Sequence, residues 1–390
     1  MKLLILGASG SIGEQTIDVI EKNPQDFTLV GFSVGYRSRC IGKIIRKHPS
    51  VTHVFLRDHT KLKYYRERFP NVTFLSEKES RLADLITLTD CEMVVNALVG
   101  FAGLLPSIKA LENNKKLALA NKESLVVGGE LINSLLKEGK GELFPIDSEH
   151  SALWKCLKVD DKNVKKMMLT ASGGAFKKLN RDQLVSVTAS DALKHPTWVM
   201  GAKITIDCAT MINKCFELIE AGYLYHYPYK KLGVMLHDES HLHSYLEYED
   251  GSYRGELSKP DMRNPIKFAL YEGKIPFDTQ TFKSLDDLKG LHFHEFDPNR
   301  YPLVSLAEIV LTKKGTYGTV LNRSNEVAVQ AFLKNEISFL DIERIVFYCM
   351  KKHKNIPHPT LKQINKVDAY ICLEANYLVY KIKKGEKIEW

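Results

Sequence analysis

The segment Lys2-Leu-Leu-Ile-Leu-Gly-Ala-Ser-Gly-Ser-Ile-Gly13 decides the class of fold. Its apolar run over 2–6 predicts a buried strand, and the pattern over 12–22 predicts a helix. Glycines spaced three residues apart stand between the two. Such a loop places backbone N–H groups and a helix N-terminus against a pyrophosphate. The segment therefore predicts a variant of the dinucleotide-binding loop, and a tight turn without a ligand is the alternative.

The same alternation of strands and helices continues to residue 146. This alternation predicts an α/β fold with a Rossmann-like parallel sheet and helices on both of its faces. Further strands are predicted over 27–34, 51–56, 93–98, 116–120 and 143–146. Further helices are predicted over 61–69 and 124–137.

The pattern changes after residue 147, where mixed helices and strands indicate an α+β region. Its helices are predicted over 151–157 and 209–225, and its strands over 166–170, 243–248 and 253–257, the last two joined by an Asp-Gly hairpin. Helices then follow over 303–312, 325–334, 340–351 and 369–383. We expect a nucleotide domain over 1–146, a catalytic domain over 147–275, a linker over 276–300 and a helical C-terminal domain over 301–390.

Composition excludes several classes of protein. The 390 residues are 44% hydrophobic and 26% charged, which excludes disorder, collagen and a coiled coil as descriptions of the whole chain. The formal charge of +8 is spread along the chain, which favours small anionic substrates over nucleic acid. Seven scattered cysteines without a C-x-x-C pair favour a reducing cytoplasm over disulfides. No apolar run is long enough for a signal peptide or a membrane span, so we expect a cytoplasmic protein.

Two short polar segments suggest a cofactor and a metal ion. Gly35-Tyr-Arg-Ser-Arg39 follows the second strand with two arginines and no acid, which favours NADP(H) over NAD, unless these arginines are only solvated. Asp147 and Glu149 follow the last strand of the nucleotide domain and would point to one side of an extended chain. Glu217 shares a helix face with Asn213 and Lys214. Three such carboxylates suit Mg²⁺ or Mn²⁺, although each one alone could be a cap or a solvated residue.

Other segments leave alternatives open. The loop over 170–174 is rich in small residues and is either a phosphate nest or an ordinary loop. The polar stretch over 195–201 holds His195 and Trp198 and is either a lid or a packed loop. Three histidines would share a face of an extended strand, where a structural role is favoured over metal binding: His237, His241 and His243.

In this order, these segments resemble 1-deoxy-D-xylulose-5-phosphate reductoisomerases of the non-mevalonate isoprenoid pathway. The motifs that carry the resemblance are GASGSIG at 7–13, ALANKESLVV at 118–127, PIDSEHSALW at 145–154, LTASGGAF at 169–176, HPTWVMGAKITIDCATMINKCFE at 195–217, PDMRNPI at 260–266 and LNRSNEVAV at 321–329. The resemblance implies a homodimer that uses NADPH and Mg²⁺ or Mn²⁺. It would convert 1-deoxy-D-xylulose 5-phosphate into 2-C-methyl-D-erythritol 4-phosphate by rearrangement and reduction.

The resemblance also implies roles for individual residues, with a mobile lid over 192–202. Cofactor contacts would be made by Ser9, Gly10, Ser11, Ile12, Gly35, Tyr36, Arg37, Asn121, Glu123 and Gly201. The metal ligands would be Asp147, Glu149 and Glu217. The catalytic set would be Lys122, His195 and these three carboxylates. Substrate contacts would be made by Lys122, Ser148, Glu149, Ser172, His195, Trp198, Cys208, Asn213, Lys214 and Glu217.

Three positions depart from the pattern of the family. Cys208 replaces the usual serine, and a thiol is a weaker hydrogen-bond donor for a phosphate. Gly35-Tyr36-Arg37 stands where Gly-Lys-Asn is frequent, and Arg323-Ser324 stands where small residues are usual. Cys208 keeps open a paralogous NADP-dependent reductase or isomerase that acts on another sugar phosphate. A non-enzymatic NADP-binding regulator would have no need for Lys122 and the carboxylates.

Overall fold

The computed structural model describes residues 1–194, 198, 200–274 and 289–388. The chain forms two compact units. The first unit holds Met1–Ser124, Ile132–Ser151 and a segment that begins at Asp261. The second unit holds Leu125–Leu131, Ala152–Pro260 and the C-terminal region. The predicted division into three domains stays a prediction.

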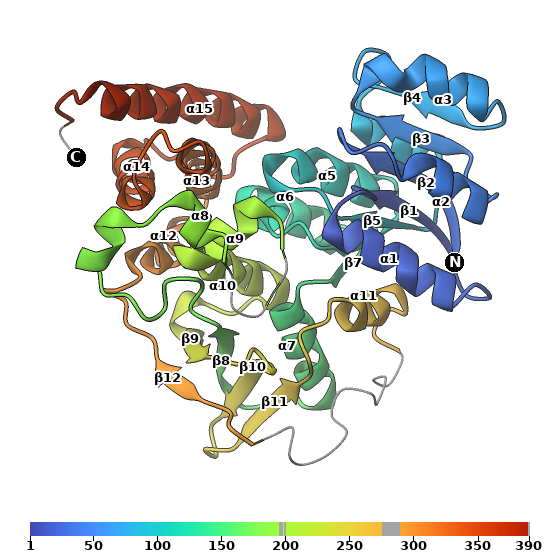
Figure 1. The fold of residues 1–390 in the computed structure, drawn as a ribbon. Coiled ribbons are helices and arrows are strands. Elements are labelled where there is room, and N and C mark those ends of the chain that lie inside the picture. The colour runs from blue at the N-terminus through green and yellow to red at the C-terminus, as the bar shows by residue number, and fades with distance from the viewer. Residues whose placement is uncertain (195–197, 199, 275–288, 389–390) are drawn as a thin grey trace. The chain divides into compact units, whose positions relative to one another are not determined.

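The first unit is built on a parallel sheet of seven strands in the order β4-β3-β2-β1-β5-β6-β7 (Figure 1). The strands are β1 (Lys2–Leu6), β2 (Thr28–Val34), β3 (His53–Leu56), β4 (Thr73–Leu75), β5 (Met93–Asn96), β6 (Lys116–Leu119) and β7 (Glu142–Pro145). The predicted sheet is confirmed, and only β4 was missed, because three residues are too few to show a pattern. The strand order reverses between β1 and β5, and ligands of α/β sheets bind at such a point.

Helices connect these strands. They are α1 (Ser11–Lys22), α2 (Ile41–Lys47), α3 (Leu62–Arg68), α4 (Leu85–Leu88), α5 (Leu104–Glu112), α6 (Glu123–Lys137) and α7 (Ser148–Val159), of which α6 and α7 continue into the second unit. A late segment returns as α11 (Arg263–Leu270), which packs on α1 through an ion pair between Arg263 and Asp18. Sequence patterns predicted α1, α3, α6 and α7 but missed α2, α4, α5 and α11.

The second unit contains a five-stranded mixed sheet in the order β11-β10-β8-β9-β12. Its strands are β8 (Val164–Ala171), β9 (Leu232–His237), β10 (Leu242–Tyr248), β11 (Tyr253–Leu257) and β12 (Phe293–Glu295). The predicted hairpin joins β10 to β11, with Gly251 at a φ of 85°. Sequence patterns missed β9 and β12. The prediction of an irregular linker over 276–300 is wrong for 293–295, and its part over 276–288 lies outside the described residues.

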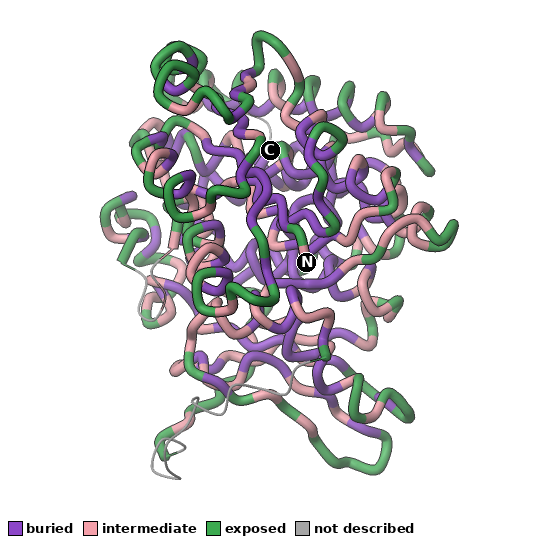
Figure 2. Tube along the Cα trace, turned by 90° about the vertical axis from the view of Figure 1, so that its right-hand side faces the viewer, coloured by how far each residue is buried: buried purple, intermediate pink, exposed green. Residues whose placement is uncertain are grey.

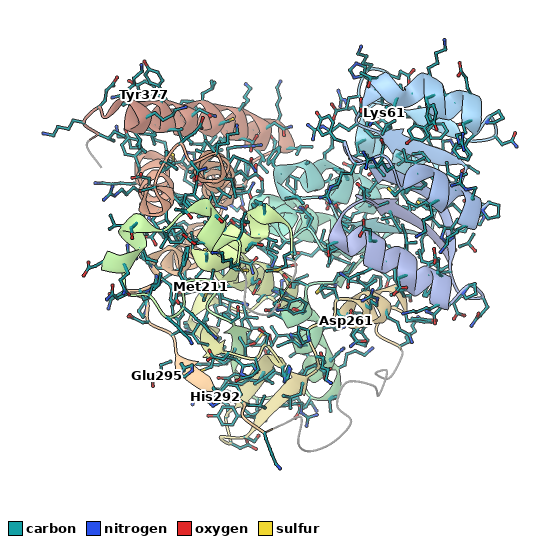
Figure 3. All side chains as sticks on the ribbon, viewed as in Figure 1. Lys61, Met211, Asp261, His292, Glu295 and Tyr377 are labelled. Atoms are coloured by element: carbon teal, nitrogen blue, oxygen red, sulfur yellow. The ribbon has the colours of Figure 1, made fainter. Side chains whose placement is uncertain are left out.

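The rest of the second unit is mainly helical, as predicted for the C-terminal region. Its helices are α8 (Ala189–Ala192), α9 (Ala202–Ala209), α10 (Ile212–Tyr225), α12 (Leu306–Lys313), α13 (Tyr317–Leu333), α14 (Phe339–Lys352) and α15 (Leu361–Lys384). Short 3₁₀ helices lie in both units at His59–Lys61, Leu82–Asp84, Gly100–Gly103, Asp182–Ser186, Tyr229–Lys231 and Pro302–Ser305. The single helix predicted over 209–225 is wrong at its start, because Met211 (labelled in Figure 3) has a left-handed φ of 61° and separates α9 from α10.

Burial follows the sheets and the inner faces of the helices. Leu3, Leu4, Ile5 and Leu6 of β1 are all 0% exposed, as expected for a parallel strand that is covered on both faces. Figure 2 shows buried positions through the interior of the trace and exposed positions on the outer loops. Within the described ranges, no helix is both long enough and apolar enough to span a bilayer.

Candidate active site

The glycine loop between β1 and α1 has the backbone that the sequence predicts. Gly7 has a φ of 92°, and its N–H donates to Ser33 Oγ on β2 at 2.9 Å. A Cβ on Gly7 would lie 2.7 Å from the carbonyl oxygen of Ala97, and one on Gly13 would overlap the backbone of Gly7 and Ala8. Only glycine therefore allows this tight turn. The predicted cofactor residues Ser9, Gly10, Ser11 and Ile12 lie at the turn and at the start of α1.

The residues predicted to select NADP(H) follow β2 and precede α2. The Tyr36 ring is 69% exposed, and the Arg57 guanidinium carbon lies 5.4 Å from its centroid. Arg37 is exposed, and Gly35 leaves open space where a side chain would stand. Arg57 is a second cation beside this surface that the sequence analysis missed, since it lies at the end of β3, which pairs with β2.

A buried hydrogen-bond network stands behind the next predicted cofactor residues. The Asn121 amide donates to the carbonyl oxygens of Leu98 and Gly100, both at 3.0 Å, and to the Glu123 carboxylate at 3.1 Å. The Asn121 side-chain oxygen accepts from the Ser124 N–H at 3.0 Å. A Cβ on Gly103 would overlap the Asn121 amide. These contacts hold Asn121 and Glu123 at the carboxyl end of β6, where α/β proteins bind ligands.

Asn96, at the end of β5, extends this network. Its amide donates to the carbonyl oxygen of Gly103 at 2.9 Å and to Ser107 Oγ at 2.8 Å, and Ser107 Oγ donates to Ser124 Oγ at 3.1 Å. Asn96, Ser107 and Ser124 are each 0% exposed. The sequence analysis missed all three residues. An asparagine at the end of an otherwise apolar strand was the one available indication.

Lys122 and Asp147 form a buried ion pair at the same sheet edge, with side chains 8% and 11% exposed. His150 Nδ1 lies 3.9 Å from the Asp147 carboxylate, and Ser148 Oγ donates to the Glu149 carboxylate at 2.6 Å. The chain is not extended between Asp147 and Glu149, because α7 already begins at Ser148, but a carboxylate oxygen of each lies within 4.8 Å of the other. Glu149 therefore lies in the first turn of a helix, and Asp147 directly precedes that helix.

The second unit holds a buried polar cluster of its own at the start of α10. Asn213 Nδ2 and Lys214 Nζ both contact the Glu217 carboxylate, which confirms the predicted helix face. The three residues are buried, with exposed fractions of 9%, 3% and 1% for Asn213, Lys214 and Glu217. A lysine thus compensates the charge of a carboxylate that would be costly to bury alone.

Ser172 and Cys208 lie on two segments of the second unit that pack together. Gly173 and Gly174 have φ values of 81° and 69°, and Ser172 Oγ accepts from the N–H of Gly174 at 3.4 Å. A Cβ on Gly174 would lie 2.6 Å from the carbonyl oxygen of Cys208 near the end of α9. The small residues predicted as a phosphate nest therefore allow close contact between this loop and α9.

The predicted lid is described in part. Trp198 is half-buried, with its ring centroid 6.2 Å from that of His243, and Gly201 is the N-cap of α9. His195 lies outside the described residues. The three histidines do not share one strand face, since His237 ends β9 and His243 belongs to β10. His237 and His243 are buried, and the His241 N–H donates to His237 Nε2 at 3.1 Å.

The parallel sheet carries a glycine loop at the point where its strand order reverses, which defines an α/β dinucleotide-binding protein. Each unit also holds a buried lysine–carboxylate pair, and such pairs are typical of an enzyme. Family models agree with this class. Residues 3–129 match the model of 1-deoxy-D-xylulose 5-phosphate reductoisomerase, residues 143–225 match the C-terminal domain of that enzyme, and residues 257–371 match the DXP reductoisomerase C-terminal domain.

Whole-chain relatives give the same result. The chain is 40% identical over 381 residues to 1-deoxy-D-xylulose 5-phosphate reductoisomerase 1 of Bacillus cereus, with 97% of this chain and 98% of that protein covered. It is 43% identical over 368 residues to the enzyme of Geobacillus kaustophilus, with 94% and 96% covered. The chain therefore belongs to the 1-deoxy-D-xylulose 5-phosphate reductoisomerase family.

Solved structures confirm the predicted fold class. A DOX-P reductoisomerase in complex with NADPH, fosmidomycin and magnesium has a TM-score of 0.90 and 31% identity, with 98% of this chain and 99% of that chain covered. The Zymomonas mobilis enzyme in complex with NADPH has a TM-score of 0.87 and 30% identity, with 97% and 98% covered.

Proposed function

We propose that this chain uses NADPH and a divalent cation to rearrange and reduce 1-deoxy-D-xylulose 5-phosphate, giving 2-C-methyl-D-erythritol 4-phosphate for isoprenoid synthesis. Membership of the family, which extends over the whole chain, supports this reaction. Among the structural observations, the buried Lys122–Asp147 pair at the carboxyl edge of the sheet carries the proposal, since it places a fixed cation beside a candidate metal ligand.

The first unit fits a dinucleotide. The turn at Gly7 and Gly13 has no room for a Cβ, so its backbone can approach a pyrophosphate closely at the start of α1. The exposed Arg37 can pair with a ribose 2′-phosphate, and Tyr36 offers a ring beside it. Asn121 and Glu123, held by the buried network, would position the reactive end of the cofactor. NADPH, when bound, supplies the hydride for the reduction.

The carboxylates fit a hard divalent cation, because all the proposed donors are oxygen atoms. Asp147, Glu149 and Glu217 would hold Mg²⁺ or Mn²⁺, which as a Lewis acid stabilises negative charge on substrate oxygens. Lys122 would add positive charge near the substrate oxygens, and Ser148 would donate a hydrogen bond to them. Asp147 and Glu217 each contact a lysine in the chain, so their charges are already compensated before a cation arrives.

The second unit would bind the phosphate end of the substrate. Ser172, Cys208 and Asn213 offer short polar side chains on segments that pack together, and Lys214 offers a buried cation beside Asn213. His195 belongs to this set in the motif. Residues 192–202 would act as a lid, with Trp198 excluding water and Gly201 close to the cofactor.

The experiment follows the absorbance of NADPH while purified protein acts on 1-deoxy-D-xylulose 5-phosphate with Mg²⁺ or Mn²⁺. Oxidation of NADPH that stops on addition of a chelator is expected, and its absence would refute the proposal. Lys122→Met should lower kcat/KM by about 10²-fold or more. Lys116→Met is the matched control, since it removes the ion pair between Lys116 and Glu272 in the same unit and should leave kcat/KM within about twofold.

Cys208 favours a second candidate, a reductase or isomerase for another sugar phosphate. A panel of sugar phosphates under the same conditions tests it, and faster turnover of any other compound would support it.

A homodimer is part of the proposal, and the exposed edge strand β11, with Tyr253 66% exposed, is a surface suited to protein contact. Light scattering should give about twice the chain mass of 44.3 kDa. A cytoplasmic location agrees with seven free cysteines.

A further inference from the structure

A buried carboxylate that the proposed chemistry does not use lies in α9. Asp207 is 1% exposed, and its carboxylate contacts Lys203 Nζ at 2.8 Å, one helical turn away. Its other oxygen accepts from Asn325 Nδ2 of α13 at 2.9 Å, and Asn325 is 0% exposed. Burial of a charge is costly without such partners. The chain therefore uses a lysine and an asparagine from two different helices to keep one carboxylate in the interior.

Asp207 directly precedes the corner where α9 gives way to α10. Cys208 comes next and packs against the loop of Ser172 through its carbonyl oxygen. Met211 then turns the chain with its left-handed backbone, and Asn213 follows in the first turn of α10. Four residues of the proposed phosphate pocket thus depend on the position of this corner: Ser172, Cys208, Asn213 and Lys214.

The partner helix α13 is itself fixed to α15. The Arg323 guanidinium makes two contacts of 2.6 Å with the Asp368 carboxylate of α15, and a third of 2.7 Å with Glu326. Arg323 precedes Asn325 by two residues on the same helix. The Arg323–Asp368 pair therefore holds the part of α13 that carries Asn325, and Asn325 in turn contacts Asp207 beside Cys208.

We propose that Asp207 is a positioning residue for the phosphate pocket, held in place by Lys203 and by Asn325 of the C-terminal helices. This inference rests on the proposed function. The helices α13 and α15 thereby contribute to substrate binding without contacting the substrate. Loss of either partner allows the corner to shift, which weakens phosphate binding and leaves the chemistry at the other end of the substrate intact.

The test compares Asn325→Leu, which removes the amide donor at similar volume, with Lys203→Met, which removes the cation. Each should raise the KM for 1-deoxy-D-xylulose 5-phosphate about tenfold, while kcat and the Kd for NADPH stay within about twofold. Lys203→Arg keeps a cation and should restore most of the affinity. Arg344→Met is the control, because it breaks another ion pair of the second unit, between the 55% exposed Arg344 of α14 and Asp341 at 3.1 Å, and should leave KM unchanged.

Inorganic phosphate is the second probe, since its binding does not depend on turnover. Both variants should raise the Kd for phosphate about tenfold by calorimetry, even if the wild type fails to act on this substrate. In that case the proposed function falls and the inference about Asp207 stands. Variants with lower thermal stability but an unchanged Kd for phosphate and an unchanged KM would overturn the inference and leave a structural role. A fall in kcat without a change in KM would overturn it equally.

Discussion

Substitution of Gly103 by alanine tests the network behind the proposed cofactor residues. A Cβ at this position would overlap the side chain of Asn121, which is 1% exposed and held by hydrogen bonds on both its amide nitrogen and its oxygen. Asn121 would have to turn away from the carbonyl oxygens of Leu98 and Gly100. The substitution therefore combines overpacking with the loss of buried hydrogen bonds.

The expected loss of stability is the sum of overpacking and lost hydrogen bonds, less the gain from a more restricted unfolded chain. Overpacking of a filled core costs about 1–3 kcal/mol, and each buried hydrogen bond lost costs about 1 kcal/mol more. Alanine restricts the unfolded chain more than glycine does, which offsets about 0.4–1 kcal/mol. With both hydrogen bonds lost, the expected net loss is about 2–5 kcal/mol, which corresponds to a fall in Tm of roughly 5–15 °C. Because Asn121 positions Glu123, the Kd for NADPH should also rise about tenfold.

Thermal unfolding and NADPH fluorescence titration measure these effects. Gly35→Ala is the control for stability, since a Cβ there would meet no atom within 4 Å, and its Tm should stay within about 2 °C of the wild type. In an Asn121→Ala background, Gly103→Ala should cost less than about 1 kcal/mol, because the obstructing amide is absent. Gly103→Ala with wild-type Tm, or with its full cost retained in that background, would refute the reasoning.

Three further predictions concern other parts of the chain. Cys208→Ser should lower the substrate KM or leave it unchanged, because a hydroxyl is the better donor, whereas a large rise would mean that the thiol is needed. Arg323→Leu removes the partner of Asp368, a carboxyl whose pKa is already raised by burial. The free energy of unfolding should fall by about 2–4 kcal/mol at neutral pH, and by less as acid neutralises Asp368. Denaturation that shows the same loss at every pH would contradict this. The hydrogen bond to Glu239 raises the pKa of His292, which lies beside β12 (Figure 3). The pair therefore stabilises the strand below the ordinary pKa of histidine, and this stabilisation is lost as pH rises. His292→Ala should speed amide exchange in β12, relative to wild type, at about pH 6 and hardly at about pH 9.

Much of the fold could be predicted because its pattern is local. Apolar runs such as that of β1 and the glycine turn after it depend on neighbouring residues, so the sequence contains them directly. The strands β4 and β12 have three residues each, which is too short for a period to appear. The break at Met211 could not be predicted, since a left-handed methionine is held by the packing of α9 and α10 and not by its own preference.

The contacts of the candidate site also fall into local ones, which the sequence predicts, and distant ones, which it does not. The contacts of Glu217 with Asn213 and Lys214 are separated by four and three residues on one helix, so periodicity alone predicts them. The Lys122–Asp147 pair needs the strand order, because it forms only when β6 and β7 are neighbours and end at the same sheet edge. The contact of Asp207 with Asn325 joins residues 118 positions apart, and no local pattern contains it.

The energetics of the buried ion pairs give an independent argument that they serve function. An ion pair in the interior often adds little stability, because desolvation of both charges offsets their attraction, and apolar residues of similar volume can be more stable. Yet Lys122 with Asp147 in the first unit, and Lys214 with Glu217 in the second, are almost completely buried. A chain under selection for stability alone has no reason to keep these pairs or the equally buried pair of Lys203 and Asp207. A chain that must bind a divalent cation and a phosphate needs buried carboxylates and buried lysines, and pairing them is the least costly way to hold both in a folded protein.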